Sequence, residues 1–381
     1  MQLTGMLWGG KLLDLVEFPR SEVLGAEASV DEIKELIAKH GSIFVKPAFK
    51  GGVGKKGKSG LLGRVNNITE ALKEKERLYF ATHEVGFIKA KADGVTFEGG
   101  VPADYEVYFS ISESTIYRAP TMTITHHGGV DIEEVANSHP EHLSRTHFSA
   151  ARPFSPFTAK NAVSAVGVTG RELNQLSTIV TNLCNLFLER DLTLAEINPI
   201  GKLEDGSILA LDCHLDMESE ARNSHSTFLK EIGVPEGDNR QARPPTQFEI
   251  DAANVDAADT RGVAGNLTEF DGNLGLIIGA GGGSLTLFDA VRAAGGKPAN
   301  YCEIGGNPSV SKAANLTKLI CSQPKVDKVA VMMNVVSNTR VDIVARGVIK
   351  GCIEAGFDPA EKIAIFRIPG SWEEEGFALL E

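Results

Sequence analysis

The sequence predicts an α/β protein made of two parts, and three observations support this fold class. Residues before position 235 hold amphipathic helices and short strands. The stretch PEGDNRQARPP at residues 235–245 has three prolines, four charged residues and almost no apolar ones, which is typical of a linker. Beyond it, strands alternate with helices, which indicates a parallel sheet. We expect one module at residues 1–234, a linker at 235–248 and a second domain at 249–381.

Composition limits the possible functions. The chain has 381 residues, 42% of them hydrophobic, and a formal net charge of −12. This acidic balance argues against a general nucleic-acid or anionic-membrane binder, because a polyanion is repelled. No apolar run reaches the ~18–20 residues of a bilayer span, and residues 1–10 lack the basic start of a secretory signal. The five scattered cysteines never form a CxxC pair, so we expect reduced thiols in a cytoplasmic protein.

In the first part, the first clear helix is expected at residues 29–40. Ser29 and Glu32 have the spacing of a capping box, and Gly41 ends the helix. A helix is hard to recognise in residues 1–15. The other elements expected before the linker are a helix at 171–189 and strands at 43–45, 194–199 and 208–212.

The second part repeats a strand, a turn and a helix. The expected strands are 274–278, 329–334 and 363–366, and the expected helices are 284–294, 309–321 and 341–355. Ligands of such folds bind at the carboxyl ends of the strands. Turns at 279–283, 336–340 and 367–370 follow these ends, and their N–H groups together with Arg367 suit a small carboxylate. Each turn alone is more often structural, and the first lacks the spacing of a dinucleotide fingerprint.

A glycine-rich basic segment runs from Lys46 to Arg64. It holds six basic residues, six glycines and no acid within an acidic protein, which favours a polyphosphate site over a solvated lysine loop. Residues 52–59 match the GxxxxGK[ST] pattern of a P-loop, but the residues that follow contain two more glycines and end as a strand instead of a helix. We therefore reject a P-loop and predict a hairpin that folds over a nucleotide, with Lys46 on its incoming strand.

A metal pair is predicted on two strands joined by a short hairpin. Glu196 and Asn198 lie on the same face of one strand, and Asp212 ends the next. An amide oxygen and a carboxylate suit Mg²⁺, which takes further oxygen ligands from substrate phosphates. Any one of these residues alone is more often a polar residue that forms a turn hydrogen bond. His214 and Asp216 are close in sequence but show no metal-ligand spacing.

Several motifs resemble, in order along nearly the whole chain, the ATP-grasp subunit of ADP-forming acyl-CoA synthetases, the family of the succinyl-CoA synthetase β subunit. The matching segments are HHGGVDIEEV (126–135), EINP (196–199), ALD (210–212), FDAVRAAGGKPAN (288–300) and DIVARGVIKG (342–351). Two segments are more similar to the citrate branch of this family, the ATP-citrate lyases. They are KPAFKGGVGKKGKSGLLGRV (46–65) and HHGGVD (126–131), which follows EGGVPADYEVYFSISES (98–114).

The resemblance implies an ATP-grasp module followed by a flavodoxin-like parallel-sheet domain. It implies Mg²⁺ as cofactor, ATP and CoA as substrates, and transfer of the γ-phosphoryl group of ATP to a histidine of a partner chain. The phosphoryl group then passes to citrate, CoA displaces phosphate, and a lyase domain cleaves citryl-CoA to acetyl-CoA and oxaloacetate. Nothing in the sequence resembles the phosphohistidine segment, the CoA-binding domain or the lyase domain. A partner subunit in a hetero-oligomer would therefore supply these parts.

The resemblance also assigns residues by position. The nucleotide contacts it implies are Lys46, Lys56, Gly57, Gly99, Val101 and Glu106. Asn198 and Asp212 would hold Mg²⁺, and Glu196, with Lys46, would be catalytic because it meets the phosphohistidine. The organic acid would contact Gly281, Gly282, Gly283, Asn338, Thr339 and Arg367. His126 and His127 fit either a partner interface or a strand.

The sequence departs from the citrate branch at three places. Residues 337–339 read Ser-Asn-Thr where that branch has Asn-Phe-Thr, and Arg367 stands where it has two arginines. The family continues with one more strand and helix after the position of Glu381. The alternatives are a citryl-CoA synthetase subunit, a succinate–CoA ligase β subunit, or a nucleotide-sensing scaffold subunit without catalysis. The sequence does not decide between ATP and GTP.

Overall fold

The structure is a computed structural model that divides the chain into two compact units, residues 1–243 and residues 244–381. It describes the whole chain except residues 4, 50–59, 86–87, 127, 129–131, 133–141, 236–244, 265–266 and 280. No helix among the described residues has the length and apolar character needed to cross a bilayer. The two units are described separately below.

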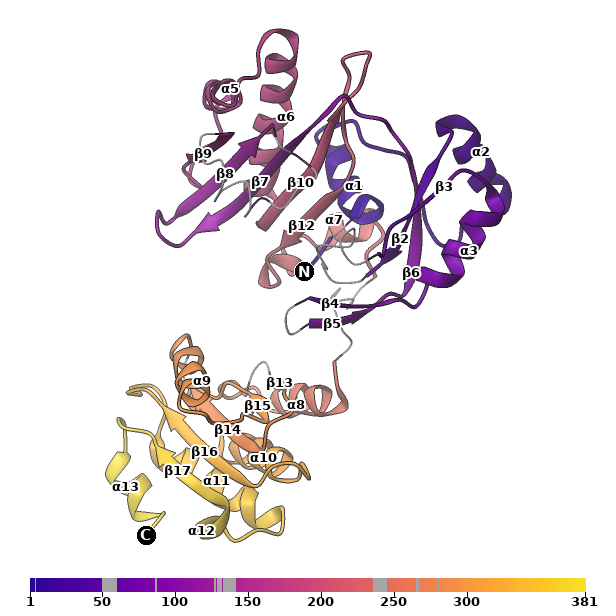
Figure 1. The fold of residues 1–381 in the computed structure, drawn as a ribbon. Coiled ribbons are helices and arrows are strands. Elements are labelled where there is room, and N and C mark those ends of the chain that lie inside the picture. Colours follow the sequence, from indigo (N-terminus) through magenta and orange to yellow (C-terminus); the bar gives the residue numbers. More distant parts are fainter. Residues whose placement is uncertain are drawn as a thin grey trace. The chain divides into compact units, whose positions relative to one another are not determined.

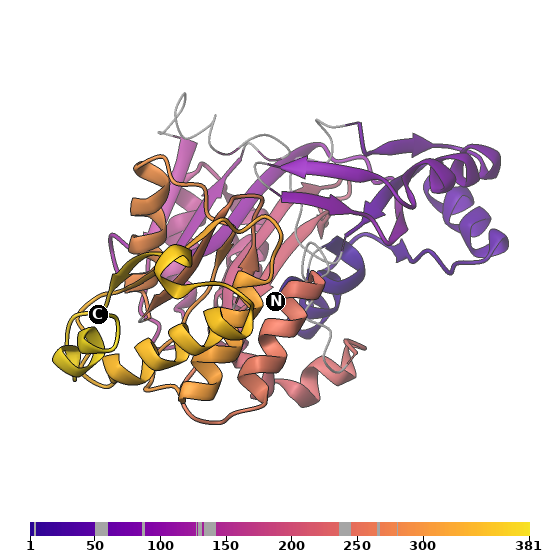
Figure 2. The ribbon, with the colours of Figure 1, turned by 90° about the horizontal axis from the view of Figure 1, so that it is seen from below.

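The smaller sheet of unit 1 has four strands in the order β1-β6-β2-β3, and all neighbouring strands are antiparallel (Figure 1). Its strands are β1 (Val23–Leu24), β2 (Ile43–Ala48), β3 (Gly63–Val65) and β6 (Gly94–Gly99). Helices α2 (Val30–His40) and α3 (Ile68–Leu78) cover one face, as Figure 2 shows. Val45 and Phe97 are buried against these helices, so Lys46 and Glu98, one position along their strands, lie on the opposite face.

The start of α2 confirms the predicted capping box. The Ser29 side chain accepts a hydrogen bond from the Glu32 backbone, and the Glu32 side chain accepts one from the Ser29 backbone. Gly41 follows the helix with a φ of 71°, which a residue with a side chain adopts only with strain. Beside this sheet, β4 (Thr82–Val85) and β5 (Ile88–Lys91) form a separate antiparallel pair.

The larger sheet of unit 1 has the strand order β11-β10-β7-β8-β9, with β12 also paired to β10. Its strands are β7 (Tyr105–Ser114), β8 (Ala119–Thr125), β9 (Leu143–His147), β10 (Leu192–Lys202), β11 (Ile208–Ala210) and β12 (Cys213–Met217). Helices α1 (Gly5–Leu15), α5 (Pro156–Ala165) and α6 (Gly170–Glu189) bury one face of it. A 3₁₀ helix (Glu220–Asn223) and α7 (Ser226–Glu231) follow the sheet.

Helix α1 corrects the sequence analysis, in which residues 1–15 showed no recognisable helix. Gly9 and Gly10 lower the helix propensity of this segment and interrupt its apolar pattern. The fold requires the first of them, because a Cβ on Gly9 would lie 2.5 Å from the Cys213 Sγ. Packing against β12 therefore stabilises a helix that local propensity does not specify.

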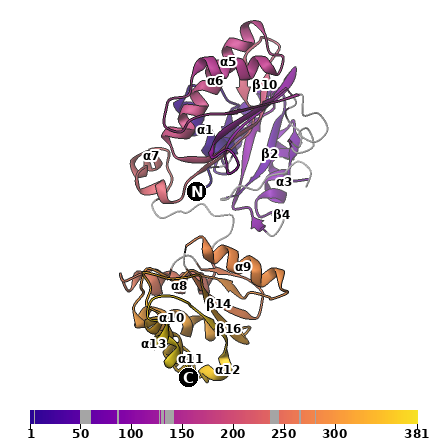
Figure 3. The same cartoon turned by 90° about the vertical axis from the view of Figure 1, so that its left-hand side faces the viewer.

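Unit 2 is built on a parallel sheet in the order β14-β16-β17, with helices on both faces (Figure 3). Its strands are β14 (Leu274–Gly279), β16 (Lys328–Met333) and β17 (Ile363–Arg367), and β13 (Thr268–Glu269) pairs with β15 (Asn300–Tyr301). Helices α8 (Gln247–Ala257), α10 (Val310–Cys321) and α11 (Val341–Glu354) pack on one face, and α9 (Gly283–Ala293) packs on the other. The short helices α12 (Pro359–Lys362) and α13 (Glu373–Ala378) complete the unit.

These elements confirm the predicted parallel sheet and its alternating helices. Helix α8 begins at Gln247, so the last two positions of the stretch predicted as a linker are helical. The cause is a capping box between Thr246 and Glu249 that starts the helix there.

Candidate nucleotide and metal site

A cavity of about 600 Å³ lies in unit 1 against the face of the small sheet that α2 and α3 leave uncovered. Lys46 and Glu98 line it from β2 and β6, and Asp212 lines it from the connection between β11 and β12. Trp8 and Phe49 add apolar surface. The cavity thus combines charged groups of opposite sign with an apolar wall, as small-molecule sites do.

Lys46 is bound by two carboxylates. Its Nζ lies 2.6 Å from the Glu98 Oε2 and 3.2 Å from the Asp212 Oδ2. Burial works to lower the pKa of Lys46, but the charges of Asp212 and Glu98 outweigh it and leave the pKa above its ordinary value. Lys46 is therefore a fixed cation at neutral pH, which suits a group that neutralises phosphate charge.

Glu98 is a site residue that sequence reasoning missed. Its side chain is 4% exposed, and its Oε1 accepts a hydrogen bond of 2.9 Å from the Thr96 hydroxyl. Because Lys46 pairs with Thr96 across β2 and β6, the antiparallel register brings the three side chains together. The alternation of polar residues at 96 and 98 with apolar residues at 95 and 97 was the available signal.

Asn198 and Asp212 are adjacent, as the sequence predicted. The Asn198 backbone N–H donates to the Asp212 backbone oxygen over 3.1 Å, where the register of β10 shifts between Ile197 and Ile200. The Cys213 backbone N–H donates to the Asp212 Oδ1, and the Asp212 Oδ2 contacts Lys46. Asp212 itself lies between β11 and β12 and not within a strand, contrary to the expected strand at 208–212.

The chemistry of these two residues fits a magnesium ion. They offer an amide oxygen and a carboxylate, and Mg²⁺ commonly takes only one or two protein ligands beside phosphate and water oxygens. Within the described residues there is no group of three or more His, Cys, Asp and Glu side chains that could hold a metal by itself. The structure therefore offers a site that would bind the metal together with a phosphate ligand.

Glu196 lies on the face of the large sheet opposite α1, α5 and α6. It pairs across the sheet with Ser110 on β7 and His214 on β12. Its Oε2 accepts a hydrogen bond of 3.2 Å from the hydroxyl of Tyr108, which is 4% exposed. Burial and then the Glu196 charge raise the pKa of Tyr108, so the phenol stays protonated and acts as a donor.

Replacing Tyr108 by phenylalanine should slow a reaction that uses the Glu196 carboxylate by about 10- to 150-fold, because the loss of one hydrogen bond to a charged group costs roughly 1.5–3 kcal/mol. The expected defect is in the rate and not in nucleotide affinity, since Tyr108 does not line the cavity. Single-turnover kinetics with Mg·ATP and titration with Mg·ADP would measure the two effects separately. Tyr117→Phe, at an exposed position in the turn between β7 and β8, is the matched control. Equal rates in the two variants would contradict this role for Tyr108.

The other predicted nucleotide contacts lie away from this cavity or outside the described residues. Gly99 ends β6, Val101 follows it and Glu106 begins β7. None of the three lines the cavity. A Cβ on Gly99 would lie 2.7 Å from the His40 ring, so this position requires glycine for packing. Lys56 and Gly57, with the whole GxxxxGKS string, fall outside the described residues, although β2 and β3 on either side form an antiparallel pair.

Of the two histidines at 126 and 127, the structure describes only the first. The His126 ring lies 5.5 Å from the Tyr105 ring, between ring centres, just after β8. His127 lies outside the described residues. Neither alternative offered for this pair is tested.

Unit 2 brings the three predicted turns to one edge of its sheet. Gly279 and Met333 are register partners, and Arg367 is a partner of Met332, so the strands end side by side. The Arg367 guanidinium donates to the Met333 backbone oxygen over 2.7 Å. This bond places an arginine where β16 and β17 end.

The remaining predicted acid contacts flank this edge. Gly281 has a φ of 57°, and α9 begins at Gly283, where a Cβ would lie 2.0 Å from the Asn334 Nδ2. Gly282 lies between them, in the turn that precedes the helix. Asn338 and Thr339 precede α11, and the Thr339 side chain is fully buried. The acid-binding role of these residues stays a prediction.

Comparison with known sequences finds a family model that matches part of this chain, and relatives that are similar over most of it. Residues 14–202 match the ATP-grasp domain. Over 356 residues the chain is 28% identical to the β subunit of the ADP-forming succinate–CoA ligase of Burkholderia ambifaria, and the match covers 92% of this chain and 86% of that protein. The corresponding subunit of Myxococcus xanthus is 28% identical over 331 residues, which are 87% of this chain and 80% of that protein.

Comparison with solved structures gives the same fold over the full length. An ATP citrate lyase from Methanothrix soehngenii, in complex with citrate and coenzyme A, matches with a TM-score of 0.68 and 19% identity, covering 97% of this chain and 88% of that one. A variant of the Methanosaeta concilii enzyme, in complex with (3S)-citryl-CoA, matches with a TM-score of 0.68 and 18% identity, covering 100% and 92%. These matches confirm the predicted fold class, an ATP-grasp module followed by a flavodoxin-like parallel-sheet domain.

Proposed function

We propose that the protein is the ATP- and citrate-binding subunit of an ATP-citrate lyase, because residues 14–202 match the ATP-grasp domain and most of the chain is similar to ADP-forming succinate–CoA ligase subunits in sequence and to ATP citrate lyases in fold. The broader class, an ATP-grasp acid–CoA ligase of the ADP-forming type, is supported by sequence and fold alike. The choice of citrate rests on the lysine-rich segment 46–65 and on segment 98–131, which resemble the citrate branch.

The observation that carries this proposal is the contact between Lys46 and Asp212 at the cavity. One group is a fixed cation for phosphate oxygens, and the other is a carboxylate for Mg²⁺, with Asn198 beside it. When bound, the metal would neutralise charge on the transferred phosphoryl group. Catalysis of phosphoryl transfer consists mostly of such positioning and charge neutralisation.

Glu196 would receive the partner histidine on the face of the large sheet opposite α1, α5 and α6. The histidine nitrogen attacks the γ-phosphorus, the bond to the β-phosphate oxygen breaks, and ADP leaves. A carboxylate that accepts the N–H of the imidazole holds the opposite nitrogen toward the phosphoryl group. The partner would then carry the phosphoryl group to citrate, bind CoA and cleave citryl-CoA.

A succinate–CoA ligase β subunit is the second candidate, and a specific observation favours it. The curated relatives at 28% identity carry that name, and they align with 87–92% of this chain. A citryl-CoA synthetase subunit would perform the same ligase chemistry and leave cleavage to another enzyme. A nucleotide-sensing scaffold is the alternative outside catalysis, and it would have no need of an intact Lys46 and Asp212.

Titration calorimetry with citrate, succinate and malate, in the presence of Mg·ADP, tests the substrate. Citrate should bind and the other two acids should not. Arg367→Ala should abolish this binding, because a bidentate arginine–carboxylate pair is lost. Lys350→Ala, at an exposed position on α11, should bind citrate as the unaltered chain does. Binding of succinate instead of citrate would change the proposed function to a succinate–CoA ligase. Binding of Mg·ADP without any of the three acids would contradict an acid site that is complete in this chain.

A further inference from the structure

Asn307 lies where three loops of unit 2 contact one another. It lies in the turn before α10, and its φ of 56° places it in the left-handed region that asparagine tolerates better than most residues. On one side is the loop at 259–264, and on the other is the turn at 336–340 that precedes α11. The second of these carries Asn338 and Thr339, which are predicted to contact the organic acid.

Asn307 makes hydrogen bonds to both neighbours. Its backbone N–H donates to the Thr339 Oγ1 over 3.2 Å, and its side-chain Oδ1 accepts from the Arg340 backbone N–H over 3.4 Å. Its backbone oxygen accepts from the Arg261 Nε over 3.1 Å. One residue therefore fixes the spacing between these loops.

The Thr339 hydroxyl connects Asn307 to Asn338 by hydrogen bonds. It accepts the bond from Asn307 and donates to the Asn338 Oδ1 over 3.4 Å. Because the Thr339 side chain is 0% exposed, it has no surface to offer a ligand. Its bond to the Asn338 oxygen turns the amide so that Nδ2, the donor, is the group left for a carboxylate.

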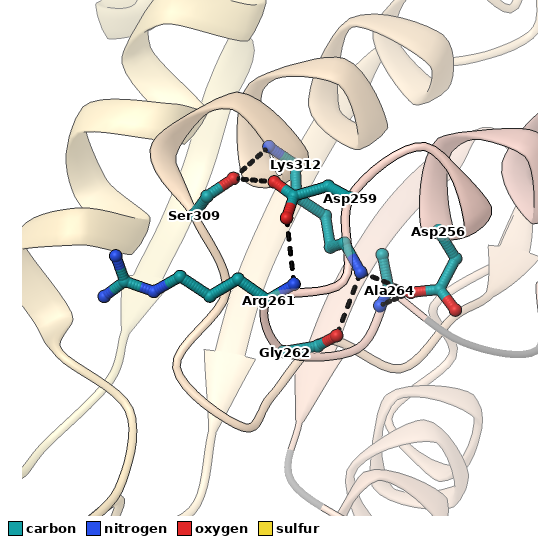
Figure 4. A network of polar contacts seen from close by, with 7 residues as sticks. All are labelled: Asp256, Asp259, Arg261, Gly262, Ala264, Ser309 and Lys312. Carbon is teal, nitrogen blue, oxygen red and sulfur yellow. Dashed lines mark hydrogen bonds and ion pairs between the residues drawn. The ribbon is translucent and has the colours of Figure 1, made fainter.

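The loop on the other side is held by a buried lysine (Figure 4). The Lys312 side chain is 1% exposed, and its Nζ lies 2.8 Å from the Asp256 Oδ1 and 2.9 Å from the Gly262 oxygen. The Ser309 hydroxyl donates to Asp259, whose other oxygen accepts from the Arg261 backbone N–H. This network fixes the backbone from which the Arg261 side chain reaches Asn307.

We propose that Asn307 is a positioning residue of the organic-acid site and acts through Thr339 to orient the Asn338 amide toward a substrate carboxylate. This rests on the proposed function, which places an acid site at this edge of unit 2. It assigns Thr339 a relay role instead of the direct contact expected from sequence. On the other side of Asn307, the Lys312 contacts with Asp256 and Gly262 hold the loop from which Arg261 bonds to the Asn307 backbone oxygen.

Calorimetric titration of the chain with citrate, in the presence of Mg·ADP, tests this role. Thr339→Val removes the relay and should weaken citrate binding about tenfold, the effect of one lost hydrogen bond at a charged ligand. Thr339→Ser keeps the hydroxyl and should restore affinity to within about threefold. Asn307→Gly keeps the left-handed backbone and its N–H but loses Oδ1, and an intermediate loss is expected. Affinity for Mg·ADP, bound in unit 1, should stay unchanged in all three.

Thr317→Val is the matched control, because it removes another buried threonine hydroxyl of the same unit, one that donates to the Ala313 oxygen of its own helix. It should leave citrate affinity unchanged. Unaltered citrate binding in Thr339→Val, failure of Thr339→Ser to restore it, or an equal loss in Thr317→Val would each overturn the positioning role. Failure of the unaltered chain to bind citrate, succinate or malate would instead overturn the acid site itself, and the role of Asn307 with it.

Discussion

Replacing Asp212 by alanine is expected to slow phosphorylation of the partner histidine by roughly 10²–10³-fold, because a charged group that stabilises the transferring phosphoryl group is lost. The fold should persist, since the Asp212 side chain is 32% exposed and lies in a connection between strands. The measurement is the rate at which radiolabelled phosphate from ATP appears on the partner subunit. Circular dichroism of the same samples checks folding.

Asp205→Ala is the control for this experiment. Asp205 lies in the turn between β10 and β11, and its carboxylate accepts hydrogen bonds from Ser207, away from the cavity. Its loss should leave the rate unchanged. If Asp212→Ala transferred phosphate as fast as this control, Asp212 would not be the proposed metal ligand. If the unaltered chain transferred no phosphate at all, the chain would be better described as a scaffold that senses nucleotide.

Replacing Lys46 by methionine is expected to have two large effects. It leaves the Glu98 carboxylate, 4% exposed, without its cation, and breaking a buried ion pair on one side costs about 3–5 kcal/mol of unfolding free energy. It also removes the cation that faces the nucleotide phosphates. Urea unfolding, followed by fluorescence, and titration with Mg·ADP measure the two losses.

The double variant Lys46→Met with Glu98→Gln separates these effects. It removes the unpaired buried charge, so most of the stability should return, but nucleotide binding should not. Lys39→Met, which breaks an exposed pair with Glu22, should change neither property appreciably. If the double variant bound Mg·ADP like the unaltered chain, Lys46 would be a structural residue only.

Much of the fold followed from local sequence patterns. The helix expected at 171–189 is α6, because an apolar stripe over twenty residues specifies a helix whatever its surroundings. In unit 2 the expected strands and helices are all present within about two residues of their predicted bounds, since the strand–turn–helix alternation repeats there. The proximity of Asn198 and Asp212 was also predictable, because a hairpin joins β10, which carries Asn198, to β11, which ends two residues before Asp212.

Other features depend on contacts between distant segments and had no local signal. Helix α1 carries three glycines and forms because it packs against β12. Glu98 became recognisable as a site residue only when the register of β2 and β6 placed it beside Lys46. Asn307 acquires its role from loops 46 residues before it and 32 residues after it. The spacing of apolar residues within one segment gives no information about such contacts between distant segments.

The contact between Lys46 and Asp212 has a consequence for how ligands enter. Without nucleotide, the lysine serves as an internal counter-ion for the carboxylate that is proposed to bind the metal. Magnesium alone must compete with it, whereas a polyphosphate offers Lys46 a replacement anion and releases Asp212. Metal and nucleotide should therefore bind with positive cooperativity, and each should raise the affinity of the other by the same factor. Lys46 thus links the two binding events, because the same ammonium group is the partner of Asp212 and the proposed partner of the phosphates.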